Sequence, residues 1–212
     1  MASLKVYVKG DPATNTLLDC PFCHRVLLTL ETKHVPYEKE YIDVNNKPSW
    51  LQERSGGKVP VINDGDFWLP DSDKIVEWLE QQHPNPSMAS SVPADVTGSF
   101  FGAFRGLLMA SAEEAADKKA AFLGELAKVE GYLAAHGPFF GGEQLDATDA
   151  AMAPKMYHAL TALGHFKGLA LDPSKFPAVS KYRELMKEQP AWKATDYGQE
   201  AVVKGWAAHM AQ

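Results

Sequence analysis

Hydrophobic and polar residues follow two different periods along the first part of this chain of 212 residues. Residues 4–8 alternate between apolar and polar, which is typical of a half-buried strand. Residues 21–33 instead carry apolar side chains at helical spacing. The same analysis predicts further strands at 37–42, 58–62 and 67–69 and helices at 50–54 and 72–82. The expected order up to His83 is therefore β-α-β-α-β-β-α, a small α/β domain at 1–83.

The pattern changes after a segment rich in proline and serine, which reads as a linker over 84–94. Aromatic and aliphatic residues then recur at helical spacing within 100–108 and again within 122–133. Asp146 and Asp149 are spaced as a capping box, with Asp146 as the cap of a helix over 150–163. We therefore expect an all-helical domain over 95–212.

Composition narrows the classes of function. The hydrophobic and charged fractions, 45% and 23%, are ordinary for a globular protein. The net charge of −6 and the lack of a basic run argue against a nucleic-acid partner. The N-terminus lacks the apolar core of a signal peptide, and no apolar stretch is long enough for a membrane-spanning helix. Two cysteines make no disulfide framework. We expect a monomer in a reducing compartment, the cytoplasm by default, with a plastid left open.

Both cysteines lie in one short stretch, DCPFCHR, where a loop meets the helix that starts at Pro21. Backbone N–H groups at a helix start carry partial positive charge and stabilise a thiolate, the reactive form of cysteine. Proline suits the first helical position, and Arg25 could add positive field. The stretch predicts a reactive thiol at Cys20 with a pKa below that of free cysteine.

Cys23 has two interpretations, because a cysteine is often a small buried hydrophobe and helical spacing can turn this one inward. The other interpretation is a second, auxiliary thiol within reach of Cys20. A zinc site is a third interpretation of the C-x-x-C-H run. Structural zinc needs four ligands, and the sequence has no second cysteine pair and no matching histidine pair. We predict no metal.

Two further signals come from polar or proline positions at element boundaries. Pro60 falls inside an expected strand, which suggests either an edge strand or a cis Val59-Pro60 peptide bond. Asp71, Ser72 and Asp73 precede a helix. Ser72 is a good helix cap, and the unpaired N–H groups beyond it are suited to a carboxylate of a ligand.

The chain resembles the glutathione transferases, and within them the dehydroascorbate reductases of plants and green algae. The resemblance rests on segments that together span nearly the whole chain: DCPFCHRVLLTLE, NNKPSW, GGKVPV, LPDSD, HGPFFGGE, APKMYHALTALGHFK and VVKGWAAH. The family implies a thioredoxin-like N-terminal domain and an all-helical C-terminal domain. The plant relatives usually carry C-P-F-S, so Cys23 departs from the pattern.

The resemblance implies a role for each matching residue. Cys20 would be the nucleophile, and Cys23 an auxiliary thiol. The expected glutathione-binding residues are Lys47, Val59, Pro60, Ser72 and Asp73. The residues expected to face dehydroascorbate are Lys9, Asp19, His158 and Trp206. Purely structural roles remain open for several of them: His158 as a hydrogen-bonded core histidine, Trp206 as packing, and the two lysines as solvated surface residues.

The implied reaction is the reduction of dehydroascorbate to ascorbate through the Cys20 thiolate and a mixed disulfide with glutathione. Glutathione is then a co-substrate, and no bound cofactor is expected. The first oxidised species at Cys20, a sulfenic acid or a thiohemiketal, stays open. So do two other classes of function: a general glutathione-dependent thiol transferase, and a non-enzymatic protein like the chloride intracellular channels. The charged residues of the helix after Cys20 argue against membrane insertion.

Overall fold

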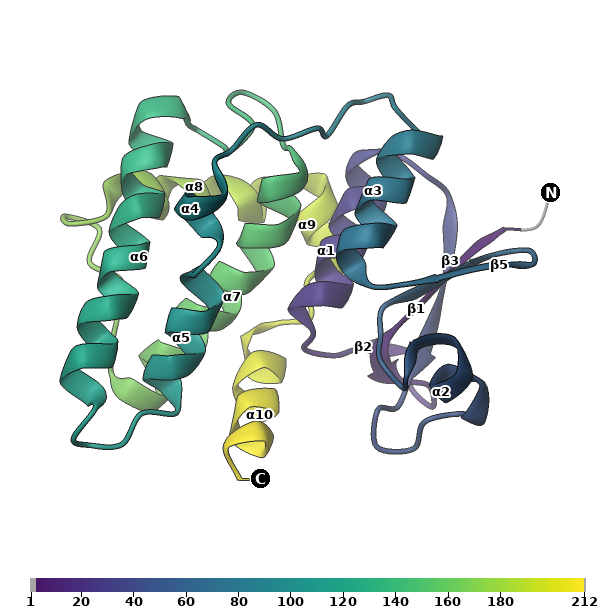
Figure 1. Cartoon of the computed structure of the whole chain (residues 1–212), viewed down its shortest axis with the longest axis horizontal. Coiled ribbons are helices and arrows are strands. Elements are labelled where there is room, and N and C mark those ends of the chain that lie inside the picture. Colours follow the sequence, from purple (N-terminus) through teal and green to yellow (C-terminus); the bar gives the residue numbers. More distant parts are fainter. Residues whose placement is uncertain (1–2, 212) are drawn as a thin grey trace. The chain divides into compact units, whose positions relative to one another are not determined.

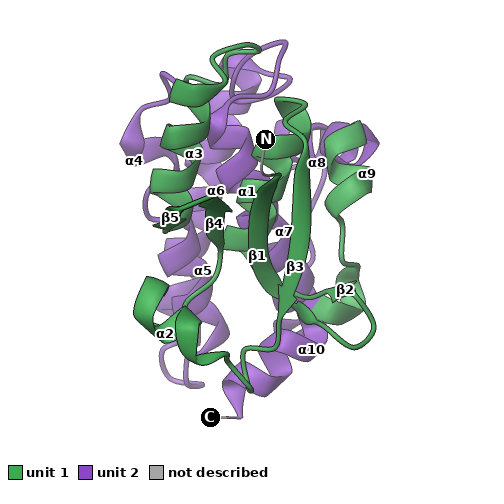
Figure 2. Ribbon diagram, turned by 90° about the vertical axis from the view of Figure 1, so that its right-hand side faces the viewer, with its two compact units in different colours: residues 1–89, 190–201 green, residues 90–189, 202–212 purple. Residues whose placement is uncertain are grey.

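A computed structural model describes residues 3–211 of the chain. Contacts divide it into two compact units, one formed by residues 1–89 and 190–201 and the other by 90–189 and 202–212 (Figure 2). This division assigns residues 190–201 to the first unit, which the linear boundaries expected from the sequence do not do. Each unit is described by itself below.

The first unit is built on a mixed five-stranded sheet, most of whose strands are labelled in Figure 1 and all of them in Figure 2. Strand β1 (Leu4–Asp11) lies at its centre. It pairs in parallel with β3 (Tyr37–Ile42) and antiparallel with β4 (Val61–Asp64), which continues antiparallel into β5 (Phe67–Pro70). The end of β1 also pairs with the short strand β2 (Thr16–Leu17). The remaining elements of the unit are α1 (Pro21–Thr32), α2 (Ser49–Ser55), α3 (Ser72–Gln82) and α9 (Pro190–Thr195).

Each face of the sheet has its own apolar cluster, because side chains of a strand alternate between the faces. On one face, Val6 and Val8 of β1 pack with Leu27 of α1 and Ile75 of α3. On the other, Tyr7 belongs to a smaller cluster with residues of α2 and β5. The alternation over residues 4–8 thus reflects a sheet that is covered on both sides.

The helix after Cys20 is also held from its other side. His24 is buried, and its Nε2 lies 2.9 Å from Oγ1 of Thr195 in α9. The ring of Trp192 packs against the His24 ring, with centroids 4.6 Å apart. This contact places residues 190–195 with the first unit although they lie far along the chain.

The second unit is helical. Its elements are α4 (Ala94–Thr97), α5 (Phe100–Leu108), α6 (Ala115–His136), α7 (Ala147–Lys167), α8 (Pro177–Glu188) and α10 (Gln199–Met210), whose first residues belong to the first unit. The capping box expected at Asp146 and Asp149 is present. Asp149 also accepts hydrogen bonds from the backbone N–H groups of Phe140 and Gly141, so it ties the preceding loop to α7.

Three expectations need correction. The strand expected over 58–62 begins at Val61, so Pro60 precedes the strand and removes no hydrogen bond from its ladder. The strand β2 was not expected, since two residues show no period. The helix expected over 150–163 extends from Ala147 to Lys167, because its cap at Asp146 directly precedes its first turn.

Candidate active site

Cys20 is the N-cap residue of α1, in an extended backbone conformation, with Pro21 as the first helical residue. Its Sγ accepts a hydrogen bond from the backbone N–H of Cys23 at 3.4 Å. A sulfur in this position satisfies an otherwise unpaired N–H group of the first turn, as an oxygen does in ordinary caps. The placement expected from the sequence at the helix start is confirmed.

The two thiols differ in burial and in acidity. Cys23 is fully buried, whereas Cys20 is half-buried, and both are free. A hydrogen bond from the Cys23 side chain lowers the pKa of Cys20 below its ordinary value, against the opposing effect of burial. Backbone N–H groups and the charge of Lys9 add to the lowering. Burial raises the pKa of Cys23 well above its ordinary value, so Cys23 stays a thiol and can donate to a Cys20 thiolate.

Cys23 is therefore a buried residue that also forms a hydrogen bond to the Cys20 sulfur. Its roles as a packing residue and as a second thiol near Cys20 do not exclude each other. Its Sγ accepts a hydrogen bond from the backbone N–H of Lys9 at 3.4 Å. This bond leaves the Cys23 proton available for the neighbouring sulfur.

Lys9 and Asp19 form an ion pair beside these thiols, with Lys9 Nζ and Asp19 Oδ1 2.8 Å apart. Lys9 comes from β1, and Asp19 directly precedes Cys20. Both side chains are largely buried, with exposed fractions of 25% and 13%. Burial raises the pKa of Asp19 despite the bond from Lys9. The pair keeps the aspartate from placing an uncompensated negative charge next to a thiolate.

The segment before β4 and the start of α3 hold four of the five residues expected to bind glutathione. The Val59-Pro60 peptide bond is cis, one of the two interpretations of that proline. Val59 and Cys20 pack against the same apolar cluster. Ser72 is buried at the first position of α3. The expected cap is wrong: Asp71 caps α3 by accepting from the backbone N–H groups of Asp73 and Lys74, because its carboxylate reaches two donors and the Ser72 hydroxyl is already inside the helix.

Arg25, which was expected to add positive field at Cys20, forms an ion pair with Asp73 at the start of α3. The groups that lower the pKa of Cys20 are Cys23, Phe22 and Lys9. No local pattern predicts the Arg25–Asp73 pair, since its members lie 48 residues apart.

Lys47 lies exposed in the loop before α2. Its side chain passes Gly57, where an added Cβ would lie 3.6 Å from Lys47 Nζ. Gly57 has a φ of 76°, which favours glycine, so a larger residue there would strain the backbone and crowd the lysine.

His158 of α7 and Trp206 of α10 lie in the second unit, where both are buried. The indole N–H of Trp206 donates to Nδ1 of His158 at 3.0 Å. Because an indole can only donate, this Nδ1 accepts, and the proton of a neutral His158 resides on Nε2. The structure joins the two residues to each other, and their place in the pocket of Cys20 stays a prediction.

Within residues 3–211, no group of three or more histidine, cysteine or acidic side chains is arranged to hold a metal ion. In the same part of the chain, no helix is both long and apolar enough to cross a membrane.

Comparison with known proteins identifies relatives over nearly the full length. The family of glutathione S-transferase N-terminal domains matches residues 16–87. A probable glutathione S-transferase DHAR1, cytosolic, of Oryza sativa subsp. japonica is 43% identical over 93% of this chain and 92% of its own length. A chloroplastic glutathione S-transferase DHAR3 of Arabidopsis thaliana is 39% identical over 96% of this chain and 79% of its own. The crystal structure of Chlamydomonas reinhardtii dehydroascorbate reductase superposes with a TM-score of 0.94, at 54% identity, over 98% of each chain.

Proposed function

We propose that Cys20 carries the chemistry of this chain, which belongs to the dehydroascorbate reductases of the glutathione transferase superfamily and catalyses the glutathione-dependent reduction of dehydroascorbate. The observation that supports this role for Cys20 is its position as the N-cap of α1, next to a buried Cys23 that donates to it and lowers its pKa. A thiolate is the nucleophile in thiol–disulfide chemistry, so this environment favours the reactive form.

The proposed cycle transfers two electrons from two glutathione molecules. The Cys20 thiolate passes two electrons to dehydroascorbate, and its sulfur then either carries a hydroxyl group from water, as a sulfenic acid, or stays bonded to the substrate carbon, as a thiohemiketal. A first glutathione thiolate attacks this sulfur and forms the mixed disulfide. Water leaves in the first case, after ascorbate has been released, and ascorbate itself leaves in the second. A second glutathione thiolate attacks this mixed disulfide, which releases glutathione disulfide and regenerates the Cys20 thiolate. The net reaction converts dehydroascorbate and two glutathiones into ascorbate and glutathione disulfide.

The remaining residues are proposed to hold the two substrates. The backbone of Val59, before cis-Pro60, is suited to pair with the cysteinyl part of glutathione. Ser72 stands at the first position of α3, where its hydroxyl and the positive end of the helix dipole favour a carboxylate, and Asp73 follows it. Lys47 supplies a positive charge for the glycyl carboxylate. Lys9 and Asp19 flank the thiolate for dehydroascorbate, and His158 and Trp206 are proposed to close that pocket.

The test is the appearance of ascorbate from dehydroascorbate and glutathione, measured for the wild-type chain and for Cys20→Ser. We expect turnover in the first and none above the uncatalysed rate in the second. Turnover of the Cys20→Ser chain near the wild-type value would contradict the role of Cys20. A parallel rate on a glutathionylated protein separates this function from a general thiol transferase, which would favour the protein substrate.

Cytoplasmic location and a monomeric state remain predictions. The relatives include proteins named cytosolic and chloroplastic. Size-exclusion chromatography with light scattering measures the second point directly.

A further inference from the structure

Arg25 and Asp73 form an ion pair whose two partners are exposed very differently. The Arg25 side chain is 13% exposed, whereas that of Asp73 is 80% exposed. Nε of Arg25 is buried and has no hydrogen-bond partner within residues 3–211. Burial of a cation that is only partly paired costs free energy, and an ion pair with so exposed a partner adds little stabilisation to offset that cost. Stability alone therefore gives a poor account of the pair.

The consequence of the pair is the orientation of Asp73. The other aspartate at this helix start, Asp71, uses its carboxylate to cap α3. Asp73 is left as the carboxylate that faces solvent in the first turn, next to the buried Ser72. Without Arg25, an exposed aspartate would sample several rotamers. With Arg25, one of its oxygens is held, and the other stays open to a ligand.

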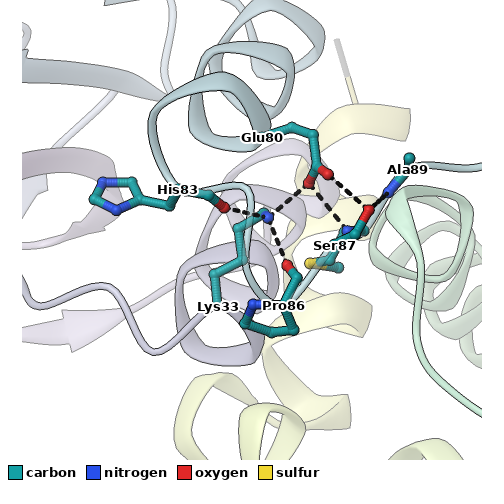
Figure 3. Close-up of polar contacts among 7 residues, drawn as sticks. Lys33, Glu80, His83, Pro86, Ser87 and Ala89 are labelled. Atoms are coloured by element: carbon teal, nitrogen blue, oxygen red, sulfur yellow. Dashed lines mark hydrogen bonds and ion pairs between the residues drawn. The ribbon is translucent and has the colours of Figure 1, made fainter.

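A second ion pair fixes α1 and α3 at their other ends. Nζ of Lys33, the C-cap of α1, lies 2.6 Å from Oε2 of Glu80 in the last turns of α3. The same Nζ donates to the backbone oxygens of His83 and Pro86, both at 2.8 Å, as Figure 3 shows. The Lys33 side chain is fully buried, so this end is an anchor.

The two ion pairs stand on matching faces of the two helices. Lys33 follows Arg25 by eight residues, and Glu80 follows Asp73 by seven, which is close to two helical turns in each case. Helices α1 and α3 contact each other between these ends. Because Lys33 also donates to the backbone oxygens of His83 and Pro86, this end stays joined when the Glu80 contact alone is weakened, and Arg25 still lies beside Asp73.

We propose that Arg25 is a positioning residue for glutathione, which acts by holding Asp73 for the γ-glutamyl end of the ligand. This end carries both an ammonium and a carboxylate group. A lone Asp73 would attract the first and repel the second, whereas the Arg25–Asp73 pair is neutral and still offers an oxygen to the ammonium. The inference rests on the proposed glutathione site at α3.

The test uses S-methylglutathione, which cannot react with Cys20, as a binding probe in titration calorimetry, together with steady-state kinetics. Arg25→Gln should weaken probe binding and raise the KM for glutathione roughly two- to tenfold, the loss expected when one side chain at the site must be ordered on binding. The KM for dehydroascorbate and kcat at saturating glutathione should stay at wild-type values. Arg25→Lys should recover part of the affinity, because it restores the charge without the planar geometry.

A double substitution separates positioning from a structural effect. If Arg25 acts through Asp73, Arg25→Gln should add no further loss of affinity to an Asp73→Asn chain. Glu80→Gln is the matched control, because it weakens the α1–α3 contact at the distant end and should lower the melting temperature without raising the KM.

The outcomes distinguish the two proposals. Wild-type chain that does not bind S-methylglutathione would contradict the glutathione site itself. Wild-type binding with equal affinity in Arg25→Gln would overturn the positioning role alone. So would additive losses in the double variant, or an equal rise in KM for Glu80→Gln, since either would assign the effect to general loosening.

Discussion

Replacement of Lys33 by methionine should destabilise the first unit more than any exposed substitution, because Lys33 is a fully buried cation with three partners (Figure 3). Methionine fills a similar volume but offers no donor. The backbone oxygens of His83 and Pro86 would lose their common donor, and Glu80 would lose its counter-charge.

The magnitude follows from what remains after the substitution. Removal of one partner of a buried ion pair costs about 3–5 kcal/mol. Glu80 softens this cost, because its side chain is 27% exposed and it keeps hydrogen bonds from Ser87 and the backbone of Met88. This brings the share of the ion pair to about 1–2 kcal/mol. The two carbonyl oxygens add about 1 kcal/mol each, the lower end of the range for a buried acceptor that loses its donor. A total loss of about 3–4 kcal/mol in the free energy of unfolding is therefore expected.

The assay is urea denaturation followed by tryptophan fluorescence, which reports mainly on the first unit because Trp50, Trp68, Trp78 and Trp192 lie there. With a slope of about 2–3 kcal/mol/M, the midpoint should fall by roughly 1–2 M. Lys5→Gln is the matched control, since it breaks the exposed Lys5–Glu40 pair and should leave the midpoint unchanged. A midpoint of Lys33→Met equal to that of the control would refute the reasoning.

Three further results are expected. Cys23→Ala should raise the pKa of Cys20, seen as iodoacetamide labelling that begins at higher pH, while Cys23→Ser should keep it low because a hydroxyl also donates; identical profiles for both would contradict the role of Cys23 as donor. Cys23→Ser should keep most of its turnover with ample glutathione but lose more activity than wild type after peroxide treatment and re-reduction, because an internal disulfide protects Cys20 from overoxidation; equal losses would argue against that protection. Burial raises the pKa of Asp149 from 3.8 to about 6, so between these pH values the folded state binds a proton that the unfolded state lacks. In urea titrations at a series of pH values, the stability of wild type relative to Asp149→Asn should therefore rise as the pH falls from about 6 to about 4. A stability difference that does not change with pH would contradict this.

Local signals in the sequence predicted most of the fold. The alternation at residues 4–8, the proline at the first position of α1 and the capping box at Asp146 each act within a few residues, so each can be read without a structure. The strand β2 has no such signal, because a strand of two residues shows no alternation and forms only through its pairing with the end of β1. The cap of α3 was misassigned because Asp71 and Ser72 are both good caps, and only backbone geometry decides between them.

The polar contacts around the site were beyond sequence reasoning for a different reason. Arg25 and Asp73 lie 48 residues apart, and His24 and Thr195 lie 171 apart. Such pairs depend on how α1 packs against α3 and α9, which no local pattern encodes. The reactive thiol at Cys20 was predictable, because its chemistry depends on the start of its own helix. Asp19 and Lys9 were named only from the family resemblance, and the structure shows that they form an ion pair with each other.

The most direct test of Cys20 as the nucleophile is to trap its mixed disulfide with glutathione. The Cys23→Ser chain, which cannot form an internal disulfide, is mixed with dehydroascorbate and one equivalent of glutathione, alkylated, and analysed by intact mass and peptide mapping. The account predicts one glutathione per chain, on Cys20, and one ascorbate released with it. A chain that also carries Cys20→Ser should show no adduct and no ascorbate above the uncatalysed rate. Ascorbate released at the normal rate without an adduct on Cys20 would contradict it.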